Sequence, residues 1–325
     1  MARRPVLSLC LLTLLLLGAI ALRLAQGGWG DTPEITRSLL ELRAMRVGAA
    51  VCVGAALAVA GVMLQSLLRN PLASPDLLGL ASGSGLGIMI AVYLAHLAGL
   101  GIASASGVGA TAAALLGAIL ALVLVYTLSQ RRGLLEPVTL ILVGVMISIL
   151  CSAGILFIKH LLPDRGEAAD RLIMGALRDD LTLTELSSVG VVTLAGLVVG
   201  VALGRAMDVA SLGEDESRSV GLSLGSLRVI LFAASGVLTA GSVLLAGPIG
   251  FVGLICPHAV RLIAGPNHRV LIVGAALAGA LLMVLADSLV RLVELPSGRL
   301  PISVITSLIG GPTLIVLLRR GDRGF

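Results

Sequence analysis

Long apolar runs without charge recur along the whole chain, and they limit its fold more than any other feature. The hydrocarbon core of a bilayer is about 30 Å thick, and a helix needs roughly 20 mainly apolar residues to cross it. Runs of that order lie at about 5–25, 44–68, 77–98, 103–128, 137–158, 186–204, 228–247, 252–264, 270–290 and 301–318. The sequence therefore predicts an all-α, polytopic membrane protein, a single domain over residues 1–325 with about ten transmembrane helices.

The composition indicates that the chain's partner is the lipid bilayer and argues against binding to nucleic acid. Hydrophobic residues make up 57% of the 325 residues and charged residues 13%, whereas about 25% is charged in a typical soluble protein. The net charge of +5 could suit nucleic acid, but the arginines fall singly or in pairs between apolar runs. One Trp, two Tyr and four Phe leave few platforms on which bases could stack. We interpret the arginines as determinants of membrane topology.

The stretch from residue 228 to 264 is too long for one membrane helix and short for two, with Gly247-Pro248-Ile249-Gly250 in its middle. We predict two crossings here, the second unusually short. With the amino terminus inside, slightly more basic residues fall in inner segments than in outer ones, which is the expected direction of the bias. Both termini are therefore predicted to be cytoplasmic.

Lysine is nearly absent, since Lys159 is the only one and is followed by His160. A GxxxxGK[ST] phosphate loop therefore cannot exist in this chain. ATP-driven work would need a separate subunit that docks on the inner side. The one long inner loop, at about 205–227, is the candidate surface, and Ser211 is a candidate N-cap of a short helix within it.

Two motif matches suggest chemistry that their surroundings do not support. Residues 221–225 match GxSxG, but a nucleophile elbow needs a strand before the serine and a helix after it. The four histidines form no HExxH motif, and the four cysteines lie far apart without CxxC pairing. We expect no catalytic residue and no metal ligand. An intramembrane hydrolase is disfavoured but stays open.

A charge inside the ninth span needs a partner, because an ionised side chain is costly in hydrocarbon. Arg291 follows Asp287 by four residues, which places both on one helix face, and we predict an ion pair between them. A coupling-ion site in a secondary carrier is the alternative. Gly196, Gly200 and Gly204 share a face of the sixth span, and this small-residue ridge predicts a helix contact.

Two blocks of motifs resemble the permeases of FecCD/BtuC type. The first is Arg69-Asn70-Pro71-Leu72-Ala73 with Pro75 and Gly79, preceded by residues 54–58 and Gln65. The second follows in the family's order and comprises residues 247–254, Pro257-His258, Arg261, residues 265–269, Asp287, Arg291 and Gly310-Gly311-Pro312. The resemblance covers about residues 40–320.

This resemblance implies a ten-helix permease subunit of an ATP-binding-cassette (ABC) importer in the cytoplasmic (inner) membrane, working by alternating access. Two permease chains, identical or paralogous, would form the path, and an extracytoplasmic substrate-binding protein would deliver the cargo. A dimer of ABC ATPase subunits would bind ATP and Mg²⁺, so this chain would be no enzyme and hold no cofactor. Ferric siderophore is the predicted cargo, with cobalamin or haem as alternatives.

Residue roles also follow from the resemblance. ATPase-coupling positions are Leu212, Gly213, Glu214 and Gly221, and binding-protein docking positions are Arg43, Arg46 and Arg291. From their polarity alone, candidates for lining the path on spans two, three and five are Gln65, Ser82, Ser84 and Ser148.

The chain departs from the family pattern at four positions: Met45 for proline, Asn267 for aspartate, Arg299 for glutamate and Ser303 for glycine. These departures leave the docking chemistry near residue 299 open. Arg299 would either add to a positive patch or pair with Glu294.

Overall fold

The computed structural model describes residues 5–27, 32–99, 108–131, 134–162, 174–178, 181–293 and 300–321. Nearly all of these residues are helical. The α-helices are α1 (Pro5–Ala25), α2 (Pro33–Leu68), α3 (Leu80–Leu97), α4 (Val108–Leu128), α5 (Pro137–Leu161), α7 (Leu183–Ala210), α8 (Glu214–Ser219), α9 (Leu224–Ala246), α10 (Val252–Ala264), α11 (His268–Leu292) and α12 (Ile302–Gly321). A 3-10 turn, η1 (Pro75–Leu78), precedes α3, and two short strands, β1 (Gln130–Arg131) and β2 (Leu134–Leu135), pair antiparallel.

Every one of the ten predicted spans corresponds to a helix, so the predicted fold class is confirmed. Among the described residues, seven helices are long and apolar enough to cross a membrane, namely α1, α2, α3, α5, α7, α9 and α11. Shorter apolar helices account for the remaining three spans, at Ala112–Leu128, Val252–Ala264 and Ile302–Ile315.

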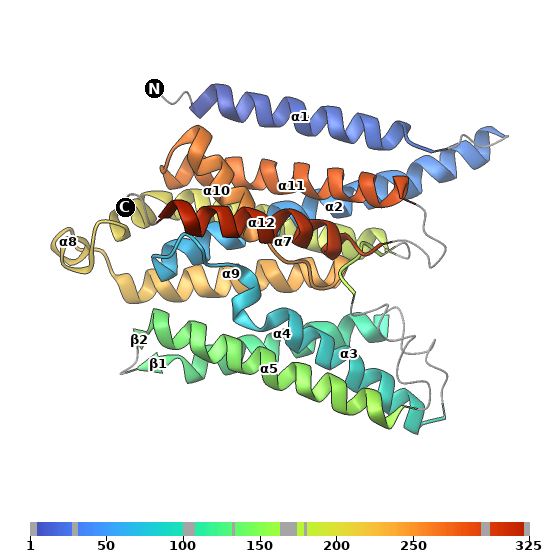
Figure 1. Ribbon diagram of the computed structural model, residues 1–325, viewed down its shortest axis with the longest axis horizontal. Coiled ribbons are helices and arrows are strands. Elements are labelled where there is room, and N and C mark those ends of the chain that lie inside the picture. The colour runs from blue at the N-terminus through green and yellow to red at the C-terminus, as the bar shows by residue number, and fades with distance from the viewer. Residues whose placement is uncertain are drawn as a thin grey trace.

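The helices lie side by side along the long axis of the molecule (Figure 1). We call one end of this bundle the α8 end, because it carries α8 and the β1–β2 hairpin. The first residue of α1 and the last residue of α12 lie at the α8 end as well (Figure 1). An even number of crossings between the termini therefore fits the structure.

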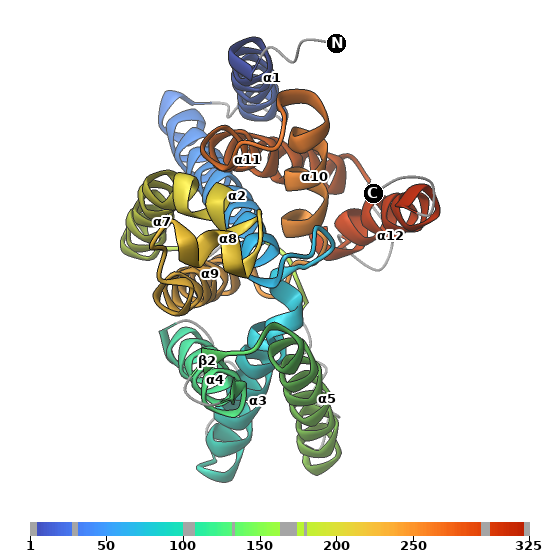
Figure 2. The ribbon, with the colours of Figure 1, turned by 90° about the vertical axis from the view of Figure 1, so that its left-hand side faces the viewer.

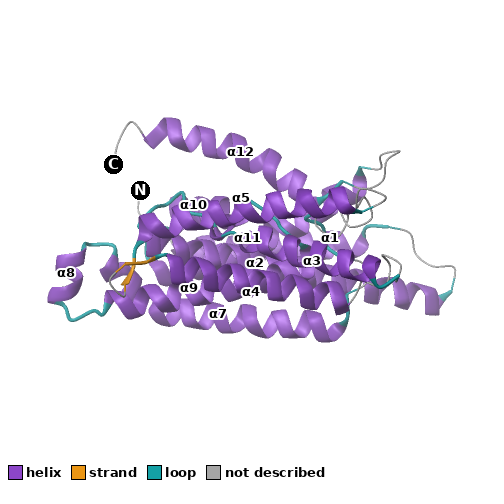
Figure 3. Ribbon diagram, turned by 90° about the horizontal axis from the view of Figure 1, so that it is seen from below, coloured by secondary structure: helices purple, strands orange, loops and turns teal. Residues whose placement is uncertain are grey.

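Helix α2 occupies the centre of the larger of two helix groups (Figure 2). It packs against α7, α9, α10 and α11, while α3, α4 and α5 form a second group that contacts α9. Helix α12 contacts α10 and α11 only along part of its length and stands to one side (Figure 3).

Close backbone approach holds the larger group together. A Cβ atom on Gly54 would clash with the carbonyl of Gly279, and one on Gly61 with the carbonyl of Gly253, so α2 touches both α11 and α10 without intervening side chains. The predicted glycine ridge on α7 is also a packing surface: its glycines meet Leu238 of α9 and Ile272 and Arg269 of α11.

Two predicted boundaries are wrong. Helix α2 starts at Pro33 instead of about 44, with the Thr32 side chain accepting a hydrogen bond from the Ile35 amide. The loop predicted at 205–227 shrinks to the turns on either side of α8, because α7 continues to Ala210 and α9 starts at Leu224. Ser211 closes the carboxyl end of α7 and is not the N-cap of α8.

Helix α10 is short, as predicted for the eighth span. Its 13 residues extend about 20 Å, less than the roughly 30 Å of the hydrocarbon core. The helix runs toward the α8 end (Figure 1), so in a bundle that crosses the bilayer it would begin between the two ends. The chain enters it through Gly247 (φ 64°) and Phe251 (φ 68°), which both have positive φ angles.

Candidate functional site

The predicted coupling residues gather at the α8 end. Leu212 and Val220 flank α8 and are 70% and 72% exposed. Glu214, the first residue of α8, forms an ion pair with Arg228 in the first turns of α9. Gly221 has a φ of 79° and open space around it, so its backbone conformation favours glycine there. The segment thus presents exposed apolar side chains on either side of a short helix that is tied to a membrane span.

Ser217 holds α8 in place from the inside. Its side chain is buried, and its hydroxyl donates to the carbonyl oxygens of Gly213 and Val209, the latter at 3.1 Å. The amide of Leu222 donates to the carbonyl of Ser217 at 3.0 Å. These bonds make α8 a defined extension of α7.

Asp208, two residues before the end of α7, links this segment to α11. Its Oδ1 accepts the backbone amide of His268 at 3.0 Å and lies 2.6 Å from the Nδ1 of the same residue. Asn267 caps the same helix, since its Oδ1 accepts the amides of Arg269 and Val270. Asn267, which stands where the family has aspartate, is therefore the N-cap of α11. The acidic group that contacts the start of this helix is Asp208.

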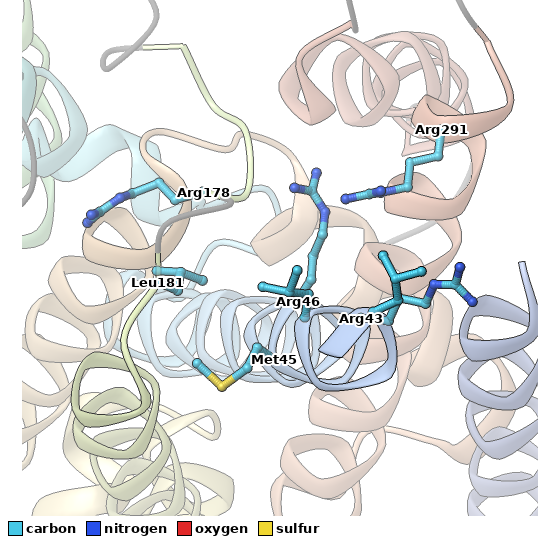
Figure 4. A pocket seen from close by; sticks show the side chains of 8 residues that line it. Arg43, Met45, Arg46, Arg178, Leu181 and Arg291 are labelled. Atoms are coloured by element: carbon cyan, nitrogen blue, oxygen red, sulfur yellow. The ribbon is translucent and has the colours of Figure 1, made fainter. Parts of the chain in front are cut away.

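At the opposite end of the bundle, the three predicted docking arginines meet in one pocket of about 310 Å³. Arg178, which the sequence analysis did not single out, joins them, and the pocket is lined by Leu39, Leu42, Arg43, Met45, Arg46, Arg178, Leu181 and Arg291. In Figure 4 the guanidinium groups of Arg46 and Arg291 point toward each other, while those of Arg43 and Arg178 point away to either side. Several like charges around one cavity favour an acidic partner.

Asp287 does not carry out its predicted role. Its Oδ1 accepts Nε of Arg46 at 2.7 Å and its Oδ2 accepts Nε of Arg23 at 2.8 Å, so the predicted pair with Arg291 gives way to a bridge between three helices. The side chains of Asp287 and Arg23 are 1% and 2% exposed. Arg46 is also buried, and this bridge fixes its position beneath the pocket.

The pocket arginines differ in how tightly they are held. Arg178 bonds Glu185 through Nη1 at 3.3 Å, and Arg43 donates from Nη1 to the carbonyl oxygen of Leu24 at 3.2 Å.

Arg299 and Glu294, on which the sequence analysis left two alternatives, lie outside the described residues. Ser303 donates its amide to the carbonyl of Gly175.

The four polar candidates for the path do not form one cluster. Gln65 is buried, and its amide bridges the carbonyls of Ala73 and Gly253 and the guanidinium of Arg261, so it joins α2 to α10. Ser84 is also buried, and none of the described residues forms a hydrogen bond with its hydroxyl. Half-buried Ser148 donates to the carbonyl of Gly144, and Ser82 is half-buried on α3.

An acidic residue that the sequence analysis overlooked lies where two chain breaks meet. Asp76 of η1 is exposed, and its Oδ2 accepts the amide of Phe251 at the start of α10 at 3.4 Å. In the sequence this aspartate directly precedes the apolar run that starts near residue 77. The structure places it beside Phe251, the residue before α10. At the centre of a membrane helix an ionised aspartate costs about 2.5–3.5 kcal/mol on insertion scales.

Comparison with known proteins gives a consistent result. The model of the FecCD transport family matches residues 6–320. The vitamin B12 import system permease protein BtuC of Escherichia coli is 36% identical over 324 residues, covering 97% of this chain and 95% of that protein. The cobalamin import system permease protein BtuC of Halobacterium salinarum is 34% identical over 90% of this chain and 76% of its own length.

Solved structures agree with the sequence comparisons. A structure described as an inward-facing conformation of a metal-chelate type ABC transporter superposes with a TM-score of 0.83 at 30% identity, covering 98% of this chain and all of that one. PsaBC from Streptococcus pneumoniae, at 14% identity and a TM-score of 0.53, shares the fold.

Proposed function

The chain belongs to the FecCD transport family, and from that premise we propose that it is the permease through which a metal chelate, cobalamin in the first place, enters the cell. Membership itself makes it a multi-pass membrane subunit of an ABC importer, a transport component and not an enzyme. The observation that carries the choice of cargo is the 36% identity along 97% of the chain to a permease named for vitamin B12.

The predicted ferric siderophore is not confirmed, and it stays the competing cargo. Its support is the resemblance of the two motif blocks to permeases that also serve siderophores. Haem is a third chelate to test in the same assay. Gly-, Ala- and Leu-rich helices offer few converging polar groups, so we expect the substrate-binding protein to make most of the selection among these chelates.

The partners of the proposed importer follow from the two ends of the bundle. We propose that an ABC ATPase dimer docks on α8, since exposed Leu212 and Val220 offer it apolar contacts and the chain has no phosphate loop of its own. ATP and Mg²⁺ would be bound by that dimer. The arginine pocket at the opposite end would receive acidic side chains of an extracytoplasmic binding protein, with Arg43 and Arg291 as the accessible contacts.

Orientation follows from these partners. The α8 end would face the cytoplasm, and both chain termini with it, in a cytoplasmic membrane. We further propose a second permease chain, identical or paralogous, with the path between the two chains. Alternating access then amounts to a shift between outward- and inward-facing populations, biased by ATP binding and hydrolysis.

The test is uptake by the reconstituted importer. Proteoliposomes with the permease, its ATPase and its binding protein would be loaded with ATP and offered cobalamin, ferric siderophores and haem in turn. We expect cobalamin to accumulate fastest. Accumulation of a ferric siderophore with no uptake of cobalamin would replace the proposed cargo and restore the prediction made from the sequence.

A further inference from the structure

Asp76 is a carboxylate without a cationic partner, and the contacts around it are few and specific. Its Oδ2 accepts the hydroxyl of Ser74 at 3.0 Å and the amide of Phe251 at 3.4 Å. In the part of the chain that the structure describes, no arginine, lysine or histidine lies within ion-pair distance of this carboxylate, and no donor reaches its Oδ1.

The depth of Asp76 follows from the length of α10. That helix is too short to cross the hydrocarbon core, and it ends at the α8 end (Figure 1). Its first turn, with Phe251 just before it, must lie within the bilayer, and Asp76 lies at hydrogen-bond distance from Phe251. The η1 turn and the start of α10 pack closely, because a Cβ atom on Gly253 of α10 would clash with the ring of Pro75 in η1.

Two non-α-helical segments therefore meet inside the membrane. One is the η1 turn between α2 and α3, and the other is the 247–251 segment before α10. Irregular backbone at this depth is tolerated where it is buried in protein or lines a water-filled cavity. Transporters of other folds place substrate sites where membrane helices are interrupted. In Figure 2 the segment between α2 and α3 lies between α5 and α12, and its η1 turn contacts α5 and α9. Asp76 is exposed within this interrupted region.

We propose that Asp76 lines the translocation path and that its Oδ1 accepts hydrogen bonds from the passing chelate. The ligand is a chelate that presents N–H donors, as the primary amides around a corrin ring do. Ser74 and the Phe251 amide hold Oδ2, which leaves Oδ1 as the acceptor for a ligand. This inference rests on the proposed function for the identity of its ligand, but not for the exposure of Asp76 to water.

A bare metal ion is a poorer ligand for this site. The described residues contain no group of three His, Cys, Asp or Glu side chains that could hold one. Two donors already point at one carboxylate oxygen, which leaves a single acceptor atom. One acceptor suits a passing hydrogen bond better than a coordination shell.

Exposure to water is tested by labelling in the assembled transporter, with permease, ATPase and binding protein in lipid. Cys10, Cys52, Cys151 and Cys256 are first replaced by alanine, and Asp76→Cys is then treated with a charged, membrane-impermeant thiol reagent in the presence and absence of ATP. We expect labelling in at least one nucleotide state. Val198→Cys, exposed in the middle of α7, is the lipid-facing control and should stay unlabelled. Absence of labelling of Asp76→Cys in every state would overturn the proposal.

Contact with the cargo is tested by transport. Asp76→Asn keeps the shape but removes the charge, and hydrogen bonds to charged groups are stronger than those between neutral ones. Cobalamin uptake below saturation should fall roughly five- to tenfold in Asp76→Asn, with partial recovery in Asp76→Glu. Glu34→Gln, which removes an exposed acid from the first turn of α2, is the matched control with wild-type uptake.

The two experiments separate this inference from the proposed function. Wild-type proteoliposomes that import no corrinoid would refute the proposed cargo, and labelling would then decide alone whether Asp76 lines the path. Labelled Asp76→Cys together with wild-type cobalamin uptake by Asp76→Asn would refute the hydrogen bond to the cargo.

Discussion

A single buried carboxylate joins three helices near the end of the bundle opposite α8. Asp287 of α11 bonds Arg23 of α1 and Arg46 of α2, and all three side chains are almost fully buried. Removing one partner from a buried ion pair typically destabilises a protein by about 3–5 kcal/mol, because the remaining charge is left without compensation. In the most apolar stretch of α1 only 17% of the residues are buried, so this bridge is a major polar anchor for that helix.

Replacing Asp287→Asn should therefore lower the thermal unfolding midpoint of the purified protein clearly. The measurement is a melting curve in one detergent, with Glu41→Gln as the control. Glu41 pairs with Arg37 on an exposed turn, where such pairs contribute about 0–1 kcal/mol. Equal midpoints for Asp287→Asn and wild type would show that the bridge does not stabilise the fold.

Arg43 and Arg291 line the pocket without a bond to Asp287, whereas Arg46 is bound to that carboxylate. Charge reversal at Arg43 and Arg291 should weaken capture of the binding protein, by roughly fivefold or more for each reversal, and flatten its dependence on salt. Titration of the binding protein against the lipid-embedded permease at several salt concentrations measures both effects. Unchanged affinity and an unchanged salt slope would refute the docking assignment.

At Arg46 itself the expected result is different. Arg46→Glu would place a second acid against Asp287 and should reduce the yield of folded protein before docking can be measured. Arg46→Lys, which keeps the charge, is the variant in which docking can be compared with wild type.

Sequence reasoning found three of the four arginines of this pocket, Arg178 excepted, but not their connections. The spacing of Asp287 and Arg291 correctly placed both on one helix face, yet the partners of Asp287 are separated from it by 241 and 264 positions. Spacing along a helix says nothing about which other helix comes near. Asp76 was missed for a related reason, since only the contact with Phe251 reveals its depth.

At the scale of single elements, α8 is short and depends on its connections. Glu214 pairs with Arg228 of α9, and Gly213 precedes the helix with a φ of 154°. Helix α8 also lies beside the Asp208 contact with α11. A force applied to α8 can therefore reach two long helices directly.

Glu214→Gln should uncouple ATP hydrolysis from transport without unfolding the permease. The expected result is a smaller stimulation of ATPase activity by the loaded binding protein, together with slower uptake. Gly213→Ala should act in the same direction through its backbone conformation. Asp215 is an exposed residue of α8 without a described ion pair, so Asp215→Asn removes a charge but no pair and should keep wild-type stimulation. Stimulation of ATPase activity equal to that of wild type in all three variants would refute the coupling role.

Helix contacts without side chains are the other element-scale feature. Gly54→Val would push α2 away from α11, since even a Cβ atom has no room there, and overpacking of this kind costs about 1–3 kcal/mol or more. Gly18→Ala on α1 is the matched control, because nothing lies within 4 Å of the added atom. Melting curves should show a clear loss for the first and no loss for the second; comparable midpoints would contradict the close approach of α2 and α11.

Apolar runs predicted which helices exist better than where they end. Hydropathy marks the part of a helix that lies in lipid, so the charged turns of α2 from Pro33 to Arg43 and the last turns of α7 escaped the prediction. The short α10 was predicted because topology required a second crossing. That its first turn faces Asp76 could not be predicted, since the two are separated by 175 positions.

For the whole molecule, α11 connects the two proposed docking regions. Its first residue, His268, bonds Asp208 beside α8, and its last turns carry Asp287 and Arg291 at the arginine pocket. With 25 residues the helix spans about 37 Å. We expect the ATPase side and the binding-protein side to communicate through α11 in the proposed importer.

The central claim is that this chain is a conduit driven by a separate ATPase. The most direct measurement is cobalamin uptake into proteoliposomes, with and without the ATPase subunits, with ATP or a non-hydrolysable analogue inside, and with ionophores that collapse all ion gradients. We predict uptake only with the ATPase and hydrolysable ATP, and no effect of the ionophores. Uptake by the permease alone that follows an ion gradient would contradict the account.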